Sequence, residues 1–325
     1  MISQALLYGP GNPSGVDFNA PIDLLGSYAT PSAGRVFIVR GDGTSVLNYD
    51  DQYTKMMPGS RMVYKSVTEA SALTVAGRGD TIMVLPNTTE NISVADQWAL
   101  KAGVKVIGIG DASNRPTFTW TAAASSILLA NAGIKLVNLN LFLCPAAGGG
   151  VTVTAPITVS AAGCSITGGS MRVSTDATTL CTIGLTTTAA ATDLTIAIPR
   201  VYGATAGTPT TCMQFVGATR LNLFNMSISA ATSATGVGVI RFLTTASTDI
   251  EVYDCVFRNN LANSTAAVTG MAGVTGEADF VTMKVLSGGA AAWGTVAGMC
   301  FGPSVVSCNT DGQRAVVFGT GSTLA

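Results

Sequence analysis

The sequence predicts an all-β fold, a right-handed parallel β-helix, and three observations support this prediction. Charged residues make up only 11% of the 325 residues, while hydrophobic residues make up 47%; an average soluble domain has roughly 25% charged residues. Short hydroxylated and β-branched side chains are abundant, and these suit a pleated surface better than a helix. Above all, short alternating segments recur at a nearly constant interval along the chain.

Residues 1–65 differ from the repeat and are predicted to form an arm or attachment region. A run of Gly and Pro at 9–13 interrupts regular structure. Two alternating segments, 35–39 and 45–49, flank a Gly-Asp-Gly turn and predict a hairpin. The arm has little periodic apolar pattern, so we expect it to order against a partner surface rather than fold alone.

A short helix is predicted next, at residues 66–76. Ser66 is followed three residues later by Glu69, the spacing of a capping box at a helix start. An open solenoid end exposes unpaired strand edges, and a helix over that end protects them. The helix is therefore expected to cap the solenoid.

The repeat occupies residues 66–260. Its spacings are 30, 30, 30, 27 and 29 residues between segments that begin at Val104, Ile134, Cys164, Leu194, Leu221 and Ile250. A second series has the same period, since Ile127 and Leu129 are followed by Ile157 and Val159. Such a coil accommodates three short strands and three turns, and it buries its apolar face only by stacking on its neighbours.

Alternation also predicts which side chains point inward. Burial is expected at Ile134, Ile166, Leu194, Leu221 and Ile250, and exposure at Lys105, Lys135 and Glu251. Two other folds remain open. A helical array or leucine-rich repeat would need apolar residues at 3.6 spacing, and a β-sandwich would not require a fixed period.

The period blurs after about Asn260. Phe280 continues it only weakly, 30 residues after Ile250, and a Gly- and Ala-rich stretch follows at 287–298. Residues 261–325 are therefore predicted to form a less regular C-terminal β region.

A more specific pattern lies in the first coils. It reads GDTIMVLP at 79–86, TENI at 89–92, GVKVIGIG at 103–110 and RPTFTW at 115–120. This resembles the opening coils of pectate-lyase-like β-helices, particularly phage and prophage structural proteins with the pattern GD.I.V.PG..E.I, GV.IIG.G and RPTF.F. Asn87 stands where that pattern has Gly, and Asn also tolerates left-handed turns. The resemblance covers residues 64–260 and implies a virion protein, commonly a homotrimer, on the capsid or tail.

One charged column is the candidate for chemistry. Polysaccharide-cleaving enzymes need clustered carboxylates for acid–base work, and the repeat aligns Asp193, Arg220 and Asp249, with Glu251 nearby. An arginine lies between the acids, whereas retaining enzymes need two carboxyl groups about 5.5 Å apart. Alternating charges that support register are the favoured interpretation.

Other sites have little support. The chain has no histidine, which removes His-dependent triads and imidazole metal sites, and no GxGxxG opens a helix at 108–110. Seven cysteines without a CxxC pair predict buried free thiols rather than disulfides or zinc ligands. Arg-Gly-Asp at 40–42 and 78–80 raises an adhesion hypothesis, although Gly beside Asp is ordinary turn chemistry. We expect no catalytic, cofactor-binding or metal-binding residues, and no cofactor.

Partners follow from charge and hydropathy. The net charge is −1 and basic residues are scattered, so no nucleic acid is expected. No apolar run reaches the ~18 residues of a membrane span, and no secretory leader is apparent, so synthesis in the host bacterial cytoplasm is expected. The resemblance implies a bacteriophage virion component, and we expect a non-enzymatic decoration or cement protein on the major capsid protein. A tailspike-like receptor-binding protein or polysaccharide depolymerase remains the alternative.

Overall fold

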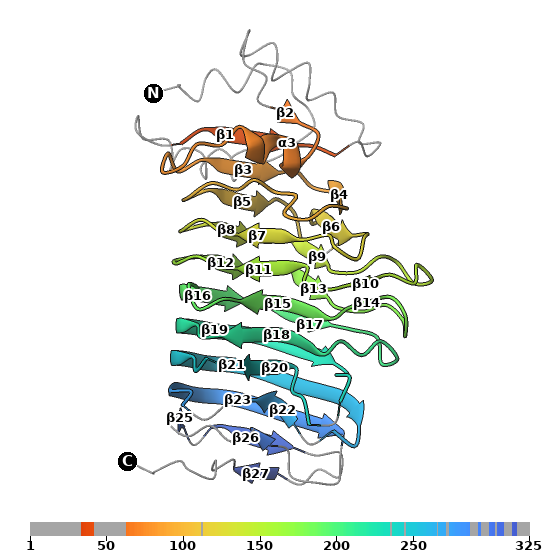
Figure 1. Cartoon of the computed structure of the whole chain (residues 1–325), viewed down its shortest axis with the longest axis vertical. Coiled ribbons are helices and arrows are strands. Elements are labelled where there is room, and N and C mark those ends of the chain that lie inside the picture. Colours follow the sequence, from red (N-terminus) through yellow and green to blue (C-terminus); the bar gives the residue numbers. More distant parts are fainter. Residues whose placement is uncertain are drawn as a thin grey trace, which may run out of the picture. The chain divides into compact units, whose positions relative to one another are not determined.

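The computed structural model describes residues 34–41, 63–111, 113–234, 236–243, 245–264, 266–270, 273–286, 292–293, 299–302, 304–308 and 314–316. Its compact unit from Arg35 onward is a parallel β-solenoid of about seven turns. Successive coils lie one above another, each contributing strands to the same ladders (Figure 1). The predicted parallel β-helix is confirmed.

Three parallel ladders make up the coils. The first consists of β1 (Val36–Val39), β2 (Val63–Tyr64), β3 (Thr81–Val84), β5 (Lys105–Gly108), β8 (Lys135–Val137), β12 (Ser165–Thr167) and β16 (Thr192–Ala197). It continues through the first parts of the long strands β19 (Thr219–Ala230), β21 (Thr248–Ala262) and β23 (Gly276–Leu286), and then β25 (Met299–Phe301).

The second ladder follows the first around each coil. It consists of β4 (Thr89–Ile92), β6 (Thr117–Trp120), β9 (Asn140–Phe142), β13 (Ser170–Arg172), β17 (Arg200–Tyr202), the later parts of β19, β21 and β23, and β26 (Val306–Cys308). Strand β27 (Arg314–Val316) pairs with β26 in the antiparallel direction.

The third ladder closes the coil. It contains β7 (Ile127–Leu129), β11 (Ile157–Val159), β15 (Ile183–Thr187), β18 (Thr211–Val216), β20 (Ile240–Leu243), β22 (Ala266–Thr269) and β24 (Ala292–Trp293). A small extra pair, β10 (Thr152–Val153) and β14 (Leu180–Cys181), joins two loops that project from neighbouring coils.

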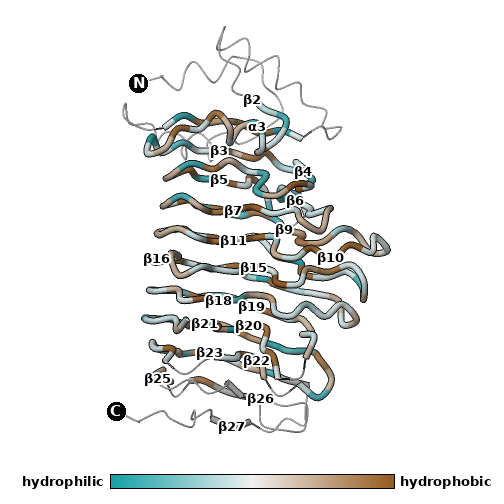
Figure 2. Tube along the Cα trace, in the orientation of Figure 1, coloured by the Kyte–Doolittle hydropathy of each residue, from teal (hydrophilic) through white to brown (hydrophobic). Residues whose placement is uncertain are grey.

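The observed register matches the predicted period. The first ladder aligns Lys105, Lys135, Ser165, Thr195, Asn222 and Glu251 in one column, and the third ladder pairs Ile127 with Ile157. The expected inward residues Ile134, Ile166, Leu194, Leu221 and Ile250 are all buried. Hydrophobic segments follow the strands from coil to coil (Figure 2).

The side chain of Lys105 is less exposed than predicted. Lys135 and Glu251 are exposed, but Lys105 is half-buried. Lys105 lies between Thr81 and Lys135 on the outer face of the sheet, so the neighbouring side chains cover part of its aliphatic stem.

The N-terminal boundary also differs from the expectation. Strand β1 lies within the predicted arm, yet it pairs in parallel with β3 over Val36–Val39 and with β2. It is therefore part of the first ladder rather than one arm of a local hairpin. The other predicted hairpin segment, 45–49, lies outside the described residues, as does 1–33.

The capping helix is shorter than predicted. Helix α3 spans Val67–Ala72, with Ser66 as its N-cap accepting a hydrogen bond from the Glu69 amide. Glu69 turns its carboxylate to the Lys65 amide. The helix ends at Ala72: the amides of Leu73 and Thr74 close a tighter turn on the carbonyls of Ala70 and Ser71, and the Val75 amide donates to the Asp80 carboxylate.

The solenoid continues past 260. Strand β23 pairs with β21 in parallel, aligning Ile250 with Gly276 and Glu251 with Glu277, so this coil has 26 residues, fewer than the predicted repeat of 27 to 30. The inward position at 276 is a glycine, which removes the apolar signal on which the period depends. Phe280, the residue expected to continue the repeat, is instead 62% exposed at a corner with φ of 53°.

Candidate functional site

The candidate charged column lies at one corner of the coils. The residue before the first inward position has a φ between 53° and 75° at Gly103, Gly133, Gly163, Asp193, Arg220 and Asp249. This left-handed corner explains the glycines of the early coils. Asp tolerates the same conformation through its short polar side chain, whereas Arg is an uncommon residue there.

The structure brings Asp193 and Arg220 together. The Arg220 guanidinium holds both carboxylate oxygens, with Nη2 to Oδ2 at 2.7 Å and Nε to Oδ1 as the second contact. This hydrogen bonding lowers the pKa of Asp193 and raises the pKa of Arg220. The two side chains are 49% and 56% exposed, so water screens the pair and its contribution to stability is small.

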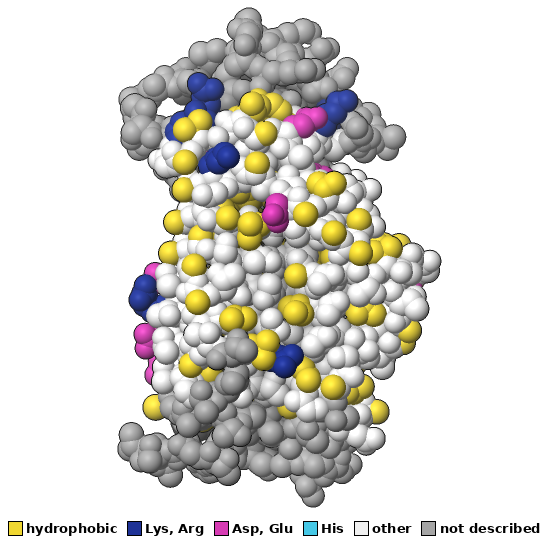
Figure 3. Space-filling view, in the orientation of Figure 1, with side chains coloured by type: hydrophobic (Ala, Val, Ile, Leu, Met, Phe, Trp, Pro, Cys, Tyr) yellow, Lys and Arg dark blue, Asp and Glu magenta, His cyan; other side chains and the backbone are white. Residues whose placement is uncertain are grey.

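The other two acids do not join that pair directly. Asp249 is next to Arg220 in register and adds a weaker Coulombic effect that raises the pKa of Arg220. Glu251 accepts a hydrogen bond from Asn222 Nδ2 at 3.3 Å. Charged side chains are sparse over the face shown in Figure 3, and acidic and basic ones lie together along its left edge.

This arrangement is poorly suited to acid–base chemistry. A general acid at neutral pH needs a raised carboxyl pKa, but the pKa of Asp193 is lowered. Arg220 also occupies the space between Asp193 and Asp249 along the ladder. The geometry is that of a charge ladder that supports strand register.

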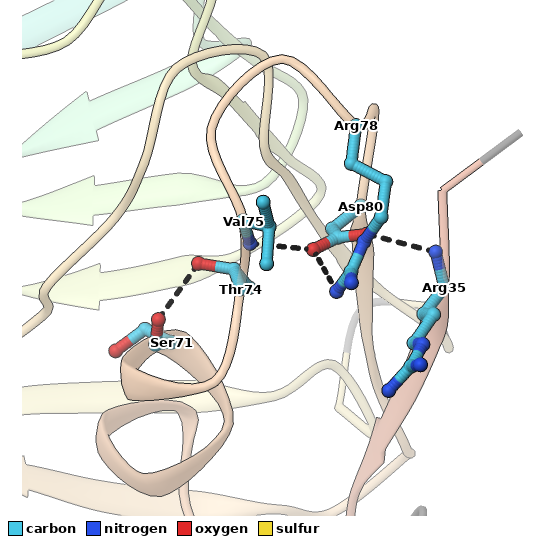
Figure 4. Close-up of polar contacts among 6 residues, drawn as sticks. All are labelled: Arg35, Ser71, Thr74, Val75, Arg78 and Asp80. Atoms are coloured by element: carbon cyan, nitrogen blue, oxygen red, sulfur yellow. Dashed lines mark hydrogen bonds and ion pairs between the residues drawn. The ribbon is translucent and has the colours of Figure 1, made fainter.

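A second polar cluster, not predicted from the sequence, surrounds Asp80 at the capped end (Figure 4). Asp80 is fully buried. Its Oδ1 accepts from the Arg35 amide at 2.8 Å and Arg78 Nε at 2.6 Å, and its Oδ2 accepts from the Val75 amide at 2.8 Å and Arg78 Nη2 at 2.6 Å. Burial acts to raise the pKa of Asp80, but these hydrogen bonds outweigh it and hold the pKa below its ordinary value.

This cluster gives the Arg-Gly-Asp motif at 78–80 a structural role. In 78–80 the arginine and aspartate bind each other, and both carboxylate oxygens are occupied. A buried, saturated carboxylate has no capacity left for an adhesion receptor, so this motif joins strands β1 and β3 to the cap. The aspartate of the other motif, at 42, lies outside the described residues.

Glu90 is the second structural carboxylate that sequence reasoning missed. It is 9% exposed and accepts from the amides of Val67 and Thr68, at 2.7 and 3.2 Å, in the first turn of α3. Trp98 Nε1 also donates to it, at 3.3 Å. Negative charge stabilises a helix N-terminus. The signal was present, because period-two alternation with Ile92 places Glu90 inward.

Among the described thiols, five are buried and free as expected, and one is exposed, contrary to the expectation. Cys144, Cys164, Cys181, Cys212 and Cys255 are free and buried. Burial raises the pKa of Cys212 and Cys255 to about 12, which makes both unreactive at neutral pH. Cys300 is free and exposed, and the side chain of Cys308 lies outside the described residues.

Within the described ranges, no group of three or more Cys, Asp or Glu side chains is arranged to hold a metal ion. No helix in the described part of the chain has the length and apolar character needed to cross a membrane.

No family model, curated protein or solved structure matches this chain.

Proposed function

We propose that this protein is a non-enzymatic structural component of a bacteriophage virion, a decoration or cement protein that docks on the major capsid protein and stabilises the head. The observation that carries the proposal is the Arg220–Asp193 pair. The cluster with the most enzyme-like composition is held as an ion pair between coils, with a lowered aspartate pKa.

Two further features support a structural role. Asp80 and Glu90 belong to the motif that resembles phage structural proteins. Their carboxylates accept hydrogen bonds from backbone amides at the capped end. The stacked ladders join every coil to its neighbours by parallel backbone hydrogen bonds, which provides a stiff element of the kind that a coat requires. The resemblance supplies the virion location, and the fold alone does not specify a role.

The arm provides the first test. Deleting residues 1–30 removes no described strand, because the compact unit begins at Arg35. We expect the truncated protein to keep the circular dichroism spectrum of a β-solenoid and to lose binding to purified particles in co-sedimentation. Retained binding by the truncated protein would contradict the docking role of the arm.

The charged column provides the second test. The double substitution Asp193→Asn with Asp249→Asn should leave particle binding and thermal unfolding nearly unchanged, because the column is exposed and screened. The purified protein is then incubated with host surface polysaccharide, and released reducing ends are measured. Reproducible cleavage that the double substitution abolishes would support the depolymerase alternative and overturn the structural proposal.

A further inference from the structure

The outer face of the first ladder has a charge pattern that is complementary to itself. One outward column, which we call the charge column, runs from coil to coil as Lys105, Lys135, Ser165, Thr195, Asn222, Glu251 and Glu277. Its two bases lie toward the N-terminal coils and its two acids toward the C-terminal coils, with short neutral side chains between them. Thr195 is the central residue, three steps from either end.

We propose that this face binds a second copy of the chain in the antiparallel direction, about a twofold axis that passes through the coil of Thr195. A twofold contact brings residue i against j and j against i. An axis along the strand direction at Thr195 therefore places Lys135 against the partner's Glu251 and Lys105 against the partner's Glu277. Each pair occurs twice in the dimer.

The neighbouring outward column supports the same contact. It runs through Ile107, Val137, Thr167, Ala197, Phe224, Tyr253 and Asp279, so most of it is apolar or small although it points away from the core. The same axis places Val137 against the partner's Tyr253 and Thr167 against the partner's Phe224. Ala197, at the centre, is small and only 7% exposed, so its neighbours in the column make the contact.

The aromatic residues of this second column are already arranged as a surface. The rings of Phe224 and Tyr253 stack with centroids 5.4 Å apart and an interplanar angle of 8°, and Tyr253 is 37% exposed. Aromatic residues are enriched in the buried centres of protein interfaces. The Phe224–Tyr253 stack lies beside the charge column, and burying it against a protein partner is more favourable than leaving it in water.

The charged residues at the corner beside the charge column are compatible with this dimer. Asp193 would face its own copy near the axis, but the Arg220 guanidinium already holds both of its carboxylate oxygens. The contact requires antiparallel solenoid axes. A cyclic trimer with parallel axes would not bring Lys135 against the partner's Glu251, so these charges favour an antiparallel pair.

Cross-linking of the unmodified protein tests the geometry directly. A carbodiimide joins a lysine amine to a carboxylate only when the two touch. Within one chain Lys135 and Glu251 are four coil steps apart, about 19 Å at the usual strand spacing of about 4.8 Å, so a Lys135–Glu251 cross-link must arise between two chains. We expect mass spectrometry of the cross-linked dimer to find it. A cross-linked oligomer without this link would overturn the proposal.

Charge reversal tests the energetics by sedimentation velocity. Lys135→Glu and Glu251→Lys should each raise the dimer dissociation constant by about tenfold or more, because like charges then face each other twice, and the double reversal should restore dimerisation. Arg258→Glu, at an exposed position of the second ladder, is the matched control and should have no effect. A monomer at every concentration, or single reversals without effect, would overturn the proposal. This inference is independent of the virion role, since it concerns self-association alone.

Discussion

Leu221 lies in the middle of the inward column, aligned with Leu194 in one neighbouring coil and Ile250 in the other. All three side chains are fully buried. Leu221→Ala should lower the free energy of unfolding by about 2 to 5 kcal/mol, the range for a core cavity that relaxes only in part. Urea unfolding measures this. Ser165→Ala, an outward position, is the control and should change it by less than about 0.5 kcal/mol; an equal loss from both variants would contradict the assigned faces.

Asp80 is the residue on which the capped end depends most. Its pKa is lower in the folded protein than in the unfolded chain. The stability it provides is therefore complete above the unfolded value of about 3.9 and is lost as the pH falls through the folded value. We expect protection of the Arg35 and Val75 amides from hydrogen exchange to decline below about pH 4.

Removing the Asp80 charge should abolish that dependence. Asp80→Asn should destabilise the cap by about 3 kcal/mol near neutral pH, the scale for breaking a buried ion pair, with faster exchange at the same two amides. Asp111→Asn, at an exposed carboxylate, should leave them protected. Unchanged exchange in the Asp80 variant would show that its hydrogen bonds contribute little.

Residue-level prediction from sequence succeeded where period-two alternation applies and missed contacts between distant segments. The burial of Leu221 and Ile250 was predicted from their positions in the repeat. The partners of Asp80 were not predicted, because the Arg35 amide is 45 residues away in sequence and meets the carboxylate only once β1 pairs with β3. Nothing in the local sequence indicates that pairing.

Turns between the strands depend on glycine where neighbouring coils come close. Gly169 is the most closely packed of the described glycines. It has a φ of 70°, and an added Cβ would overlap the backbone carbonyl of Leu139 in the previous coil. Gly148 has a similar φ of 84° with open space around it. Gly148→Ala should therefore cost about 1 to 2 kcal/mol from the left-handed conformation alone, and Gly169→Ala should cost clearly more. Thermal unfolding of the two variants measures the difference, and equal losses would contradict the close approach of these coils.

The boundaries of helices and strands were harder to predict than their type. The capping helix was predicted from Ser66 and Glu69, but its end at Ala72 has no comparable signal in the sequence. The last full coil was missed because its inward position is Gly276 rather than an apolar residue. The first error arises because backbone hydrogen bonds tighten the last turn of the helix, and the second because glycine has no apolar side chain to extend the pattern.

At the scale of the whole molecule, a single period accounts for most of the fold. Repeats of 27 to 30 residues imply one strand register for the first ladder, and the observed register agrees from Lys105 to Glu251. The alignment of Asp193, Arg220 and Asp249 followed from the same register. The pairing of Arg220 with Asp193 alone did not, because both acids flank it equally in the sequence pattern.

Function is less determined than fold, since one solenoid architecture serves unrelated roles. We propose that this protein is a structural part of a virion. The most direct test is imaging of purified particles by electron microscopy, with an antibody against the protein and a particle preparation that lacks its gene as control. We expect label at regular positions on the head and a head that breaks more readily when the protein is absent. Particles without label, together with undiminished head stability in the deletion, would contradict it.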